Sequence, residues 1–320
     1  GELAEKMVAA LTAAGAVHTA DDFAAAGCDY VDLIKTDFHG HDVHQIPPNG
    51  QGITALIMIN ILKGFDVANL DPAGAQRFHL QAEAARLAYL ARDKYVADMS
   101  KADVPVDMLL SDEFAAHLRG YIEIGKAGDP TGADALTKHK DTVYLSVVDK
   151  EGTAVSFINS LFHPFGSGIA CADTGVIFQN RGAGFVVDKS HPNCVAPGKR
   201  PMHTIIPGMV TKGDKATHCY GVMGGGYQPV GHAHVLSNMM DYGMDVQEAI
   251  ECPRAFYNAG VLELEESIDP AVRQELVDMG YEVETPAMPH GGGQMIMIDH
   301  ENGVVAAGTE SRKDGHALAY

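Results

Sequence analysis

Hydrophobic positions recur at helical spacing through most of the first half of the chain. Apolar residues three and four positions apart predict three helices, over 2–14, 51–64 and 75–98. The third of these helices is long and amphipathic. Between the first two, Tyr30–Phe38 and Asp42–Ile46 alternate in the manner of a β-hairpin that turns at His39-Gly40. Pro47-Pro48-Asn49-Gly50 then interrupts the chain before the next helix.

The pattern changes near residue 140, where alternation replaces helical spacing. Thr142–Val148 and Thr153–Leu161 predict two strands joined by the turn sequence Asp149-Lys150-Glu151-Gly152. Helices are expected over 229–242 and 269–279, and further strands near 176–179, 219–223, 261–264, 281–284, 293–298 and 303–307. Helices grouped between strands, without regular βαβ order, predict an α+β layered sandwich.

Composition narrows the range of partners. Of the 320 residues 46% are apolar and 20% charged, and the net charge is −19. Because such an acidic surface repels phosphate backbones and anionic lipid headgroups, no nucleic acid and no membrane is expected as a partner. The sequence has no apolar run of the roughly 18 residues that a membrane span needs. It shows no signal peptide, and Gly1 suggests a start within a longer product, so cytoplasm and periplasm both stay open.

Cysteine and histidine patterns give no support for a metal site. The five cysteines are widely spread without a C-x-x-C, which argues against a disulfide scaffold or a zinc site and favours small buried side chains. His39, His41 and His44 lack an acidic or cysteine partner at a metal-site spacing, so solvated turn histidines are expected. His232 and His234, two apart on a helix, do not share a face. We predict no metal and no other cofactor.

One segment has chemical interest, Asp141-Thr142-Val143-Tyr144-Leu145-Ser146-Val147-Val148-Asp149. A threonine at the start of a strand is common, because β-branched residues favour strands. The segment nevertheless resembles the start of the small subunit in the γ-glutamyltransferase (glutathione hydrolase) family, whose members are N-terminal-nucleophile hydrolases. There a threonine begins a strand that runs to Ser-Val-Val-Asp-x-x-Gly. Once cleavage makes a threonine N-terminal, its own α-amine, with an unperturbed pKa of about 7.7–8.0, can act as general base for its hydroxyl.

Other motifs of that family recur in the same order along residues 1–320. They are Gly1-Glu2, Pro47-Pro48, Ser160, Phe165-Gly166-Ser167-Gly168, Gln179–Phe185, Lys199–Pro207, Gly224-Gly225, Asp241-Tyr242-Gly243, Pro253-Arg254 and Glu310-Ser311-Arg312. Each motif alone is weakly specific, whereas the ordered set is specific for the family. The resemblance implies a four-layer αββα sandwich of the N-terminal-nucleophile hydrolase type.

The resemblance also implies roles for individual residues. Thr142 would be the nucleophile, freed by self-cleavage at Asp141–Thr142, and Ser160 would hydrogen-bond it. Residues 1–141 would be the C-terminal part of the large subunit and 142–320 the small subunit, joined as a heterodimer, with a dimer of heterodimers left open. Gly224 and Gly225 would supply the backbone N–H groups of an oxyanion hole. Two alternatives for these glycines are a phosphate-binding turn, which lacks its G-x-x-x-x-G-K-[ST] or G-x-G-x-x-G signature, and a plain tight turn.

Several positions depart from those that hold the γ-glutamyl group in typical members. Phe162 replaces an asparagine and Arg181 a glutamine, Gly184 replaces the aspartate that binds the substrate α-amine, and the Ser-Ser pair for the α-carboxylate is His203-Thr204. A lost acid and a gained arginine favour a substrate with a carboxylate and no ammonium group. A structural ion pair is the alternative role for Arg181. The stretch from Phe185 to Lys199 is short, which leaves little room for a lid.

The sequence therefore predicts an autoprocessed amide hydrolase or acyltransferase that acts on a small carboxylate-bearing amide. Segments of the Asn-Arg-Gly kind resemble those of acylase-like and oxamate-amidohydrolase-like branches of the family. Two alternatives stay open: a genuine γ-glutamyltransferase, and a non-catalytic binding protein on the same fold. The family's large subunit also has an arginine that contacts the substrate carboxylate, in a part that is outside these 320 residues.

Overall fold

A computed structural model describes residues 1–129 and 141–320, with Asp141 described by its backbone alone. The helices are α1 (Glu2–Ala13), α2 (Ala20–Ala25), α3 (Gly52–Leu62), α4 (Ala75–Tyr95), α5 (Val106–Leu109), α6 (Asp112–Arg119), α7 (Gln228–Met240), α8 (Val246–Glu251) and α9 (Pro270–Asp278). Short 3₁₀ helices are η1 (Val67–Asn69), η2 (Arg181–Gly184) and η3 (Gly225–Tyr227).

The strands are β1 (Ile34–Phe38), β2 (His41–Gln45), β3 (Asp141–Val148), β4 (Ala154–Phe162), β5 (Ala170–Cys171), β6 (Val176–Ile177), β7 (Gly208–Lys212), β8 (Lys215–Met223), β9 (Ala255–Asn258), β10 (Val261–Leu264), β11 (Glu282–Glu284), β12 (Gly292–Asp299) and β13 (Val304–Thr309). The expected hairpins and most of the expected helices and strands are present. The sequence patterns missed the short helices α2, α5, α6 and α8 and the strands β5, β7 and β9, because segments this short carry little periodicity.

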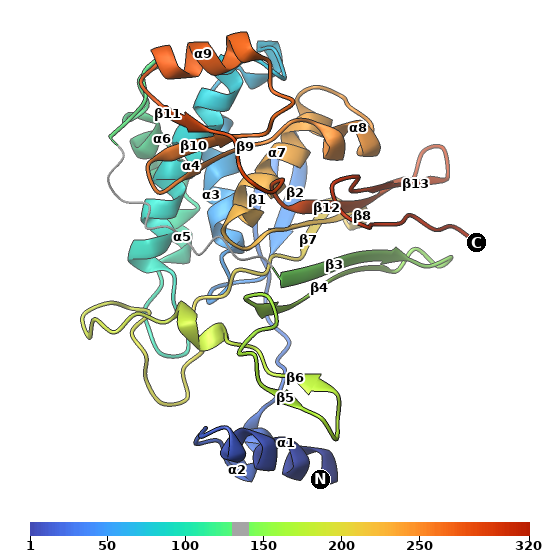
Figure 1. Cartoon of the computed structure of the whole chain (residues 1–320). Helices are drawn as coiled ribbons and strands as arrows, with labels where there is room; N and C mark the ends of the chain where they lie inside the picture. The colour runs from blue at the N-terminus through green and yellow to red at the C-terminus, as the bar shows by residue number, and fades with distance from the viewer. Residues whose placement is uncertain (130–140) are drawn as a thin grey trace.

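A six-stranded antiparallel sheet in the order β1-β2-β7-β8-β12-β13 forms the centre of the molecule. The helices α3, α4 and α7 lie over one face of it, and the ribbon of β3 and β4 lies against the other face, as Figure 1 shows. The main hydrophobic core fills the space between sheet and helices and includes Val43, Leu56, Tyr220 and Tyr227. Helices, sheet and ribbon thus form successive layers of an α+β sandwich.

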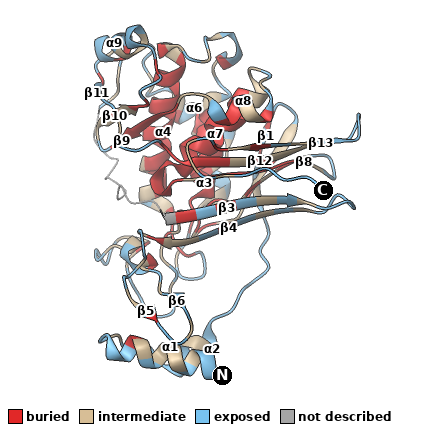
Figure 2. Cartoon of the chain, turned by 45° about the vertical axis from the view of Figure 1, so that its right-hand side comes forward, coloured by how far each residue is buried: buried red, intermediate tan, exposed pale blue. Residues whose placement is uncertain are grey.

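Helix α4 corrects one expectation, because it is long, as predicted, but has no separate apolar and polar faces. It is buried on almost all sides between α3, α7, α9 and β9 (Figure 2). Four of its charged residues are buried as well, Arg77, Glu83, Arg86 and Arg92. Arg86 pairs with Glu83 at 2.7 Å, and Arg92 pairs with Asp93. Charged side chains on a helix can therefore be buried away from solvent when they form ion pairs with neighbouring residues.

The β3–β4 ribbon presents a polar face to the large sheet and an apolar face outward. Ser146 Oγ donates to the Cys219 carbonyl of β8 at 3.0 Å. The Tyr144 ring covers Gly221 so closely that a Cβ there would lie 2.3 Å from it, so only glycine fits. The outer face is exposed and consists of Val143, Leu145, Val147, Val155 and Phe157.

Two parts of the chain lie beside the sandwich. A three-stranded sheet, β11-β10-β9, packs with α9 around a second core that includes Leu262, Leu264 and Leu276. The N-terminal helices α1 and α2 lie apart from the main body, and α1 contacts β5 (Figure 1). No helix of the described residues is long and apolar enough to cross a membrane.

The cysteine expectation is correct only in part. Cys171 and Cys219 are buried and Cys194 and Cys252 half-buried, but Cys28 is exposed, because it lies in the extended segment between α2 and β1. All five are free thiols. Among the methionines, Met295 is buried in the main core, and Met239, Met240 and Met297 pack against it.

The histidines of the hairpin pair with protein groups. His39 lies 2.7 Å from Asp241 at the end of α7, and His44 contacts Thr211 of β7. No group of three or more metal-binding side chains occurs within the described ranges. His232 and His234 are both buried in α7.

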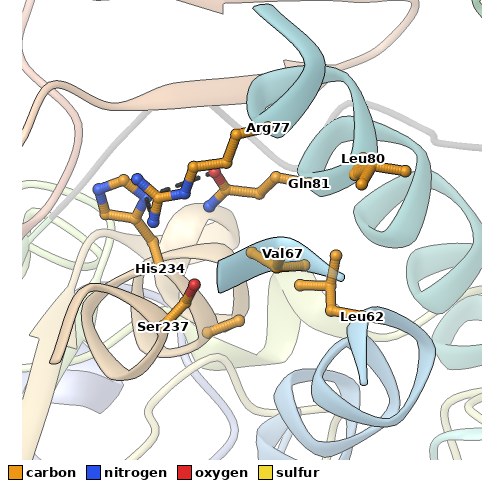
Figure 3. A pocket seen from close by; sticks show the side chains of 8 residues that line it. Leu62, Val67, Arg77, Leu80, Gln81, His234 and Ser237 are labelled. Atoms are coloured by element: carbon orange, nitrogen blue, oxygen red, sulfur yellow. Dashed lines mark hydrogen bonds between the residues drawn. The ribbon is translucent and has the colours of Figure 1, made fainter. Parts of the chain in front are cut away.

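A small polar cavity lies between α3, α4 and α7 (Figure 3). Arg77, Gln81 and His234 gather on one side of it, where His234 Nδ1 is 3.4 Å from Arg77 Nη2 and 3.3 Å from Gln81 Oε1. Its volume of about 10 Å³ suits a single water molecule. The cavity is therefore too small for an organic substrate.

A buried ion-pair network holds the start of β12. Arg254 and Glu310, both fully buried, pair at 2.6 Å, and Arg312 contacts Glu310 and Glu265 at 2.8 Å. Glu310 also accepts the Gly293 N–H at 2.9 Å. Burial opposes ionisation of Glu310, but Arg254, Arg312 and the Gly293 N–H together lower the pKa of its carboxyl group.

Replacing Glu310 with glutamine is expected to lower the free energy of unfolding by about 3–5 kcal/mol, because it leaves Arg254 buried without a counter-charge. Since the pKa of Glu310 is depressed in the folded state, the stabilisation is present above the usual carboxyl range and lost as pH falls through the folded value. The penalty should therefore shrink in acid. Urea unfolding at pH 7 and pH 3 measures it, with the exposed Glu301→Gln as control. Equal stability of the two variants at pH 7 would contradict the role of the network.

Candidate active site

Thr142 and Ser160 face each other at one end of the ribbon. The strand register pairs the two residues, and Thr142 Oγ1 donates to Ser160 Oγ at 3.0 Å. Thr142 is buried, with 8% of its surface exposed. Ser160 Oγ also accepts the Phe162 N–H at 3.0 Å. Strand β4 ends at Phe162, one residue beyond the predicted end at Leu161. The expected hydroxyl pair is present.

The ladder between β3 and β4 is irregular next to Thr142. The register shifts between Asp141 and Thr142, so that Asp141 pairs with Phe162 and Leu161 is the additional residue of a bulge. Phe162 has a positive φ of 80°, which is uncommon for an aromatic residue. The Leu161 carbonyl turns away and accepts the Asn180 N–H at 3.1 Å. The Asp141 side chain and residues 130–140 lie outside the described residues, so cleavage at Asp141–Thr142 stays a prediction.

Arg181 stacks on the residue that follows this bulge. Its guanidinium carbon lies 4.2 Å from the centre of the Phe162 ring, and its Nη1 donates to Thr204 Oγ1 at 2.7 Å. Only 5% of Arg181 is exposed. Burial lowers its pKa to about 10, so the side chain stays a cation at neutral pH.

Two N–H groups of Arg181 are buried without an acceptor. Within the described part of the chain, Nε and Nη2 have no hydrogen-bond partner and no carboxylate pairs with the guanidinium. This argues against a structural ion pair. Nε–H and Nη2–H project from the same edge of the planar group, and such an edge matches the two oxygens of one carboxylate. The unpaired edge of Arg181 therefore has the geometry that a planar anion would need.

His203 and Thr204 complete this side of the site. The pKa of His203 is lowered to about 3 by burial and by the nearby charge of Arg181, so its ring is neutral at pH 7. Gly184 ends the 3₁₀ turn that Arg181 begins, and a Cβ there would lie 3.0 Å from the Met202 carbonyl oxygen. Phe162, Arg181, Gly184, His203 and Thr204 thus gather in one place and supply no carboxylate that could bind an ammonium group.

Gly224 and Gly225 make a sharp turn at the end of β8. Their φ angles of 141° and 59° favour glycine, and a Cβ on Gly224 would lie 2.9 Å from Gly291 Cα. The Tyr227 N–H donates to the Gly224 carbonyl at 3.1 Å and closes the turn. The first N–H groups of such a helical turn have no acceptor within the helix, so they are available to a ligand. A turn that needs glycine is present, and its role as an oxyanion hole stays a prediction.

Sequence patterns missed Gln51, which contacts both sides of the site. Its Nε2 donates to the Thr204 carbonyl at 2.8 Å and to the Gly225 carbonyl at 2.9 Å. In the sequence Gln51 is a polar residue between Gly50 and Gly52, in a segment whose composition predicts only an interruption before a helix. Nothing in that pattern predicts a residue of the site. The segment is also tied to the second half of the chain by the His203 N–H, which donates to the Asn49 carbonyl at 2.9 Å.

Together these residues have parts that acyl transfer needs: a buried hydroxyl, a buried glycine turn that begins a 3₁₀ helix, and a buried cation with two unpaired N–H groups. Comparisons with known proteins agree with this class. The family model described as gamma-glutamyltranspeptidase matches residues 1–320, and the chain belongs to that family.

The most similar relatives include acylases and amidohydrolases. The chain is 36% identical to a glutathione hydrolase-like YwrD proenzyme of Bacillus subtilis and 33% identical to an oxamate amidohydrolase proenzyme of Klebsiella pneumoniae. These alignments cover 99% and 100% of this chain but 61% of each relative. The chain thus spans about three fifths of the length of the curated relatives that it matches.

A solved structure confirms the fold class. The chain superimposes on a cephalosporin acylase from Bacillus halodurans with a TM-score of 0.91 and 39% identity, over 100% of this chain and 59% of that one. The fold is that of N-terminal-nucleophile hydrolases, the αββα sandwich that the sequence predicted.

Proposed function

We propose that this chain is the greater part of an autoprocessed amide hydrolase or acyltransferase that acts on small amides with a free carboxylate. The observation that carries the proposal is the buried Arg181 with its open Nε and Nη2 edge. Phe162 supports that guanidinium and also donates its N–H to Ser160, the partner of Thr142. The Arg181 cation and the Thr142 hydroxyl are thereby linked through three contacts, from Arg181 to Phe162, from Phe162 to Ser160 and from Ser160 to Thr142.

The reaction follows from an N-terminal threonine. Cleavage before Thr142 frees its α-amine, which takes the hydroxyl proton as Oγ1 adds to the substrate carbonyl carbon. The carbonyl oxygen becomes an oxyanion that the N–H groups of the Gly224–Gly225 turn would stabilise. The amide C–N bond then breaks, the leaving amine takes the proton, and an acyl ester on Thr142 remains. Water or a second amine attacks that ester and restores the hydroxyl.

The assembly implied by this chemistry is a heterodimer of residues up to 141 and from 142 to 320, with a small-molecule amide as substrate. Names of the relatives as proenzymes support such processing. No metal and no cofactor is needed by these steps. A genuine γ-glutamyltransferase and a non-catalytic binding protein are the competing outcomes of the tests below.

A matched pair of substrates tests the specificity. γ-Glutamyl-p-nitroanilide and glutaryl-p-nitroanilide differ only by the α-amine, and burying an ammonium beside Arg181 without a carboxylate would cost several kcal/mol. Glutaryl-p-nitroanilide is therefore expected to be the better substrate, and glutathione a poor one. Replacing Arg181 with glutamine should lower kcat/KM for the glutaryl compound about 10–100-fold, because charge-assisted hydrogen bonds contribute about 1.5–3 kcal/mol.

Pentanoyl-p-nitroanilide, which has a methyl group in place of the carboxylate, is the control for this variant. Turnover of pentanoyl-p-nitroanilide should change little in Arg181→Gln, since this compound has no carboxylate to pair with Arg181. Faster turnover of the γ-glutamyl compound by the wild type would instead indicate the main family activity. No turnover of any amide by the processed protein would indicate a binding protein.

A further inference from the structure

Gln51 is fully buried where three segments of the chain meet. It precedes α3, and its backbone N–H donates to the His203 carbonyl at 2.8 Å. Its side chain continues into the site between the Thr204 carbonyl and the Gly225 carbonyl, at 2.8 and 2.9 Å from Nε2. One amide group thus uses both of its N–H donors on two different parts of the site.

The other end of the Gln51 amide is fixed as well. Its Oε1 accepts from Arg92 Nη1 at 3.2 Å. The Arg92 guanidinium in turn lies 4.3 Å from the centre of the Tyr89 ring, and the Tyr89 hydroxyl donates to the Gly226 carbonyl. Gln51, Arg92 and Tyr89 therefore hold the two consecutive carbonyls of Gly225 and Gly226 from the helix layer.

Fixing a carbonyl also fixes the N–H on the other side of the same peptide group. In a planar trans peptide the C=O and N–H point in opposite directions. When Gln51 binds the Gly225 carbonyl, the Gly226 N–H must point away from Gln51. The same bond holds Gly225 itself in place, and the Gly225 N–H is one of the expected oxyanion donors. The same side chain holds the Thr204 carbonyl, and the Thr204 hydroxyl accepts from Arg181. Displacement of one side of the site would therefore displace the other.

We propose that Gln51 is a positioning residue that sets the distance between the glycine turn and the unpaired edge of Arg181, and thereby the acyl chain that fits between them. This inference rests on the proposed function. The carboxylate of the substrate would lie at Arg181 while its amide carbonyl reaches the glycine turn. A rigid spacing between the two would favour one chain length of acyl group, since a misplacement of about 1 Å can reduce the rate about 100-fold.

The test compares Gln51→Met and Gln51→Glu with Gln81→Met. Gln81 is a matched control: it is a buried glutamine of the helix layer, and it lies on α4 eleven residues before Arg92, about 16 Å along the helix (Figure 3). Methionine fills a similar volume but cannot donate. Glutamate is isosteric, keeps an acceptor for Arg92 and loses both donors, so it decides the test if the methionine variant does not fold.

The readout is the ratio of kcat/KM for glutaryl- and pentanoyl-p-nitroanilide, because that ratio does not depend on the fraction of correctly folded enzyme. We expect the Gln51 variants to reduce kcat on both substrates about 10–100-fold and to reduce the ratio about tenfold. Succinyl- and adipyl-p-nitroanilide have acyl chains one methylene shorter and one methylene longer than glutaryl-p-nitroanilide. The Gln51 variants should discriminate between these compounds and glutaryl-p-nitroanilide less strongly than the wild type does.

The control Gln81→Met should keep the wild-type kcat, ratio and chain-length preference. Wild-type ratios in a folded Gln51 variant, or equal losses in Gln81→Met, would overturn the inference while leaving the proposed function intact. If the wild type itself hydrolyses no anilide of this series, the proposed function is what fails.

Discussion

Replacing Thr142 with alanine is expected to leave the chain uncleaved and without measurable turnover. The same hydroxyl would attack the preceding peptide bond during processing and the substrate during catalysis. Alanine removes this group from its position 3.0 Å from Ser160 Oγ and adds no new polar atom. Thr142→Ser, which keeps a hydroxyl, should retain part of both activities. No other change in this chain is expected to have a larger effect.

Denaturing electrophoresis and the anilide assay measure the two steps separately. Wild-type protein should give two fragments of about 141 and 179 residues, and Thr142→Ala a single band. Thr153→Ala is the matched control, because Thr153 lies exposed at the turn of the same ribbon. Normal processing of Thr142→Ala would show that another residue is the nucleophile.

Replacing Gly225 with valine is expected to reduce kcat about 10²–10³-fold while the chain still processes. The loss of one oxyanion-hole donor has an effect of about 2.7–4 kcal/mol on the barrier. Gly225 has a φ of 59°, where a β-branched residue is strained, so valine would turn the peptide groups that Gln51 and Tyr89 now orient. The main effect should be on kcat, because the oxyanion exists only after attack on the carbonyl.

Gly243→Val is the control for backbone strain. Gly243 has a similar φ of 67°, and a Cβ there would meet nothing within 4 Å. Both variants should lose stability, measured by thermal unfolding, but only Gly225→Val should lose turnover. Unchanged kinetics in folded Gly225→Val would place the oxyanion hole elsewhere in the protein.

The family resemblance predicted the pairing of Thr142 with Ser160, and the structure shows that a local turn produces it. The turn after Asp149, closed by the Thr153 carbonyl, pairs Val148 with Ala154. Counting six residues back along one strand and forward along the other then brings Thr142 opposite Ser160. The glycine turn at the end of β8 was predictable for a similar reason, since its positive φ angles are a local requirement.

The surroundings of Arg181 were only partly predictable. The sequence suggests an arginine where the family has a glutamine, but an arginine can bind substrate or pair with a carboxylate of its own chain. Only the folded structure shows that Arg181 is buried on Phe162 with Nε and Nη2 unpaired among the described residues. The surroundings of Arg181 depend on Thr204 and on the bulge at Leu161, which are distant from it in the sequence. No pattern in the neighbouring residues predicts them.

By itself, then, the sequence determined the elements with strong periodicity, the two strands of the ribbon, the glycine turn and membership of the family. Tertiary structure decided three further points: the burial of α4, the open edge of Arg181 and the position of Gln51 between Thr204 and Gly225. The physical reason is range. Periodicity and turn chemistry act between neighbours in the chain, whereas Gln51 meets partners 153 and 174 residues away, and only packing of the layers brings them together.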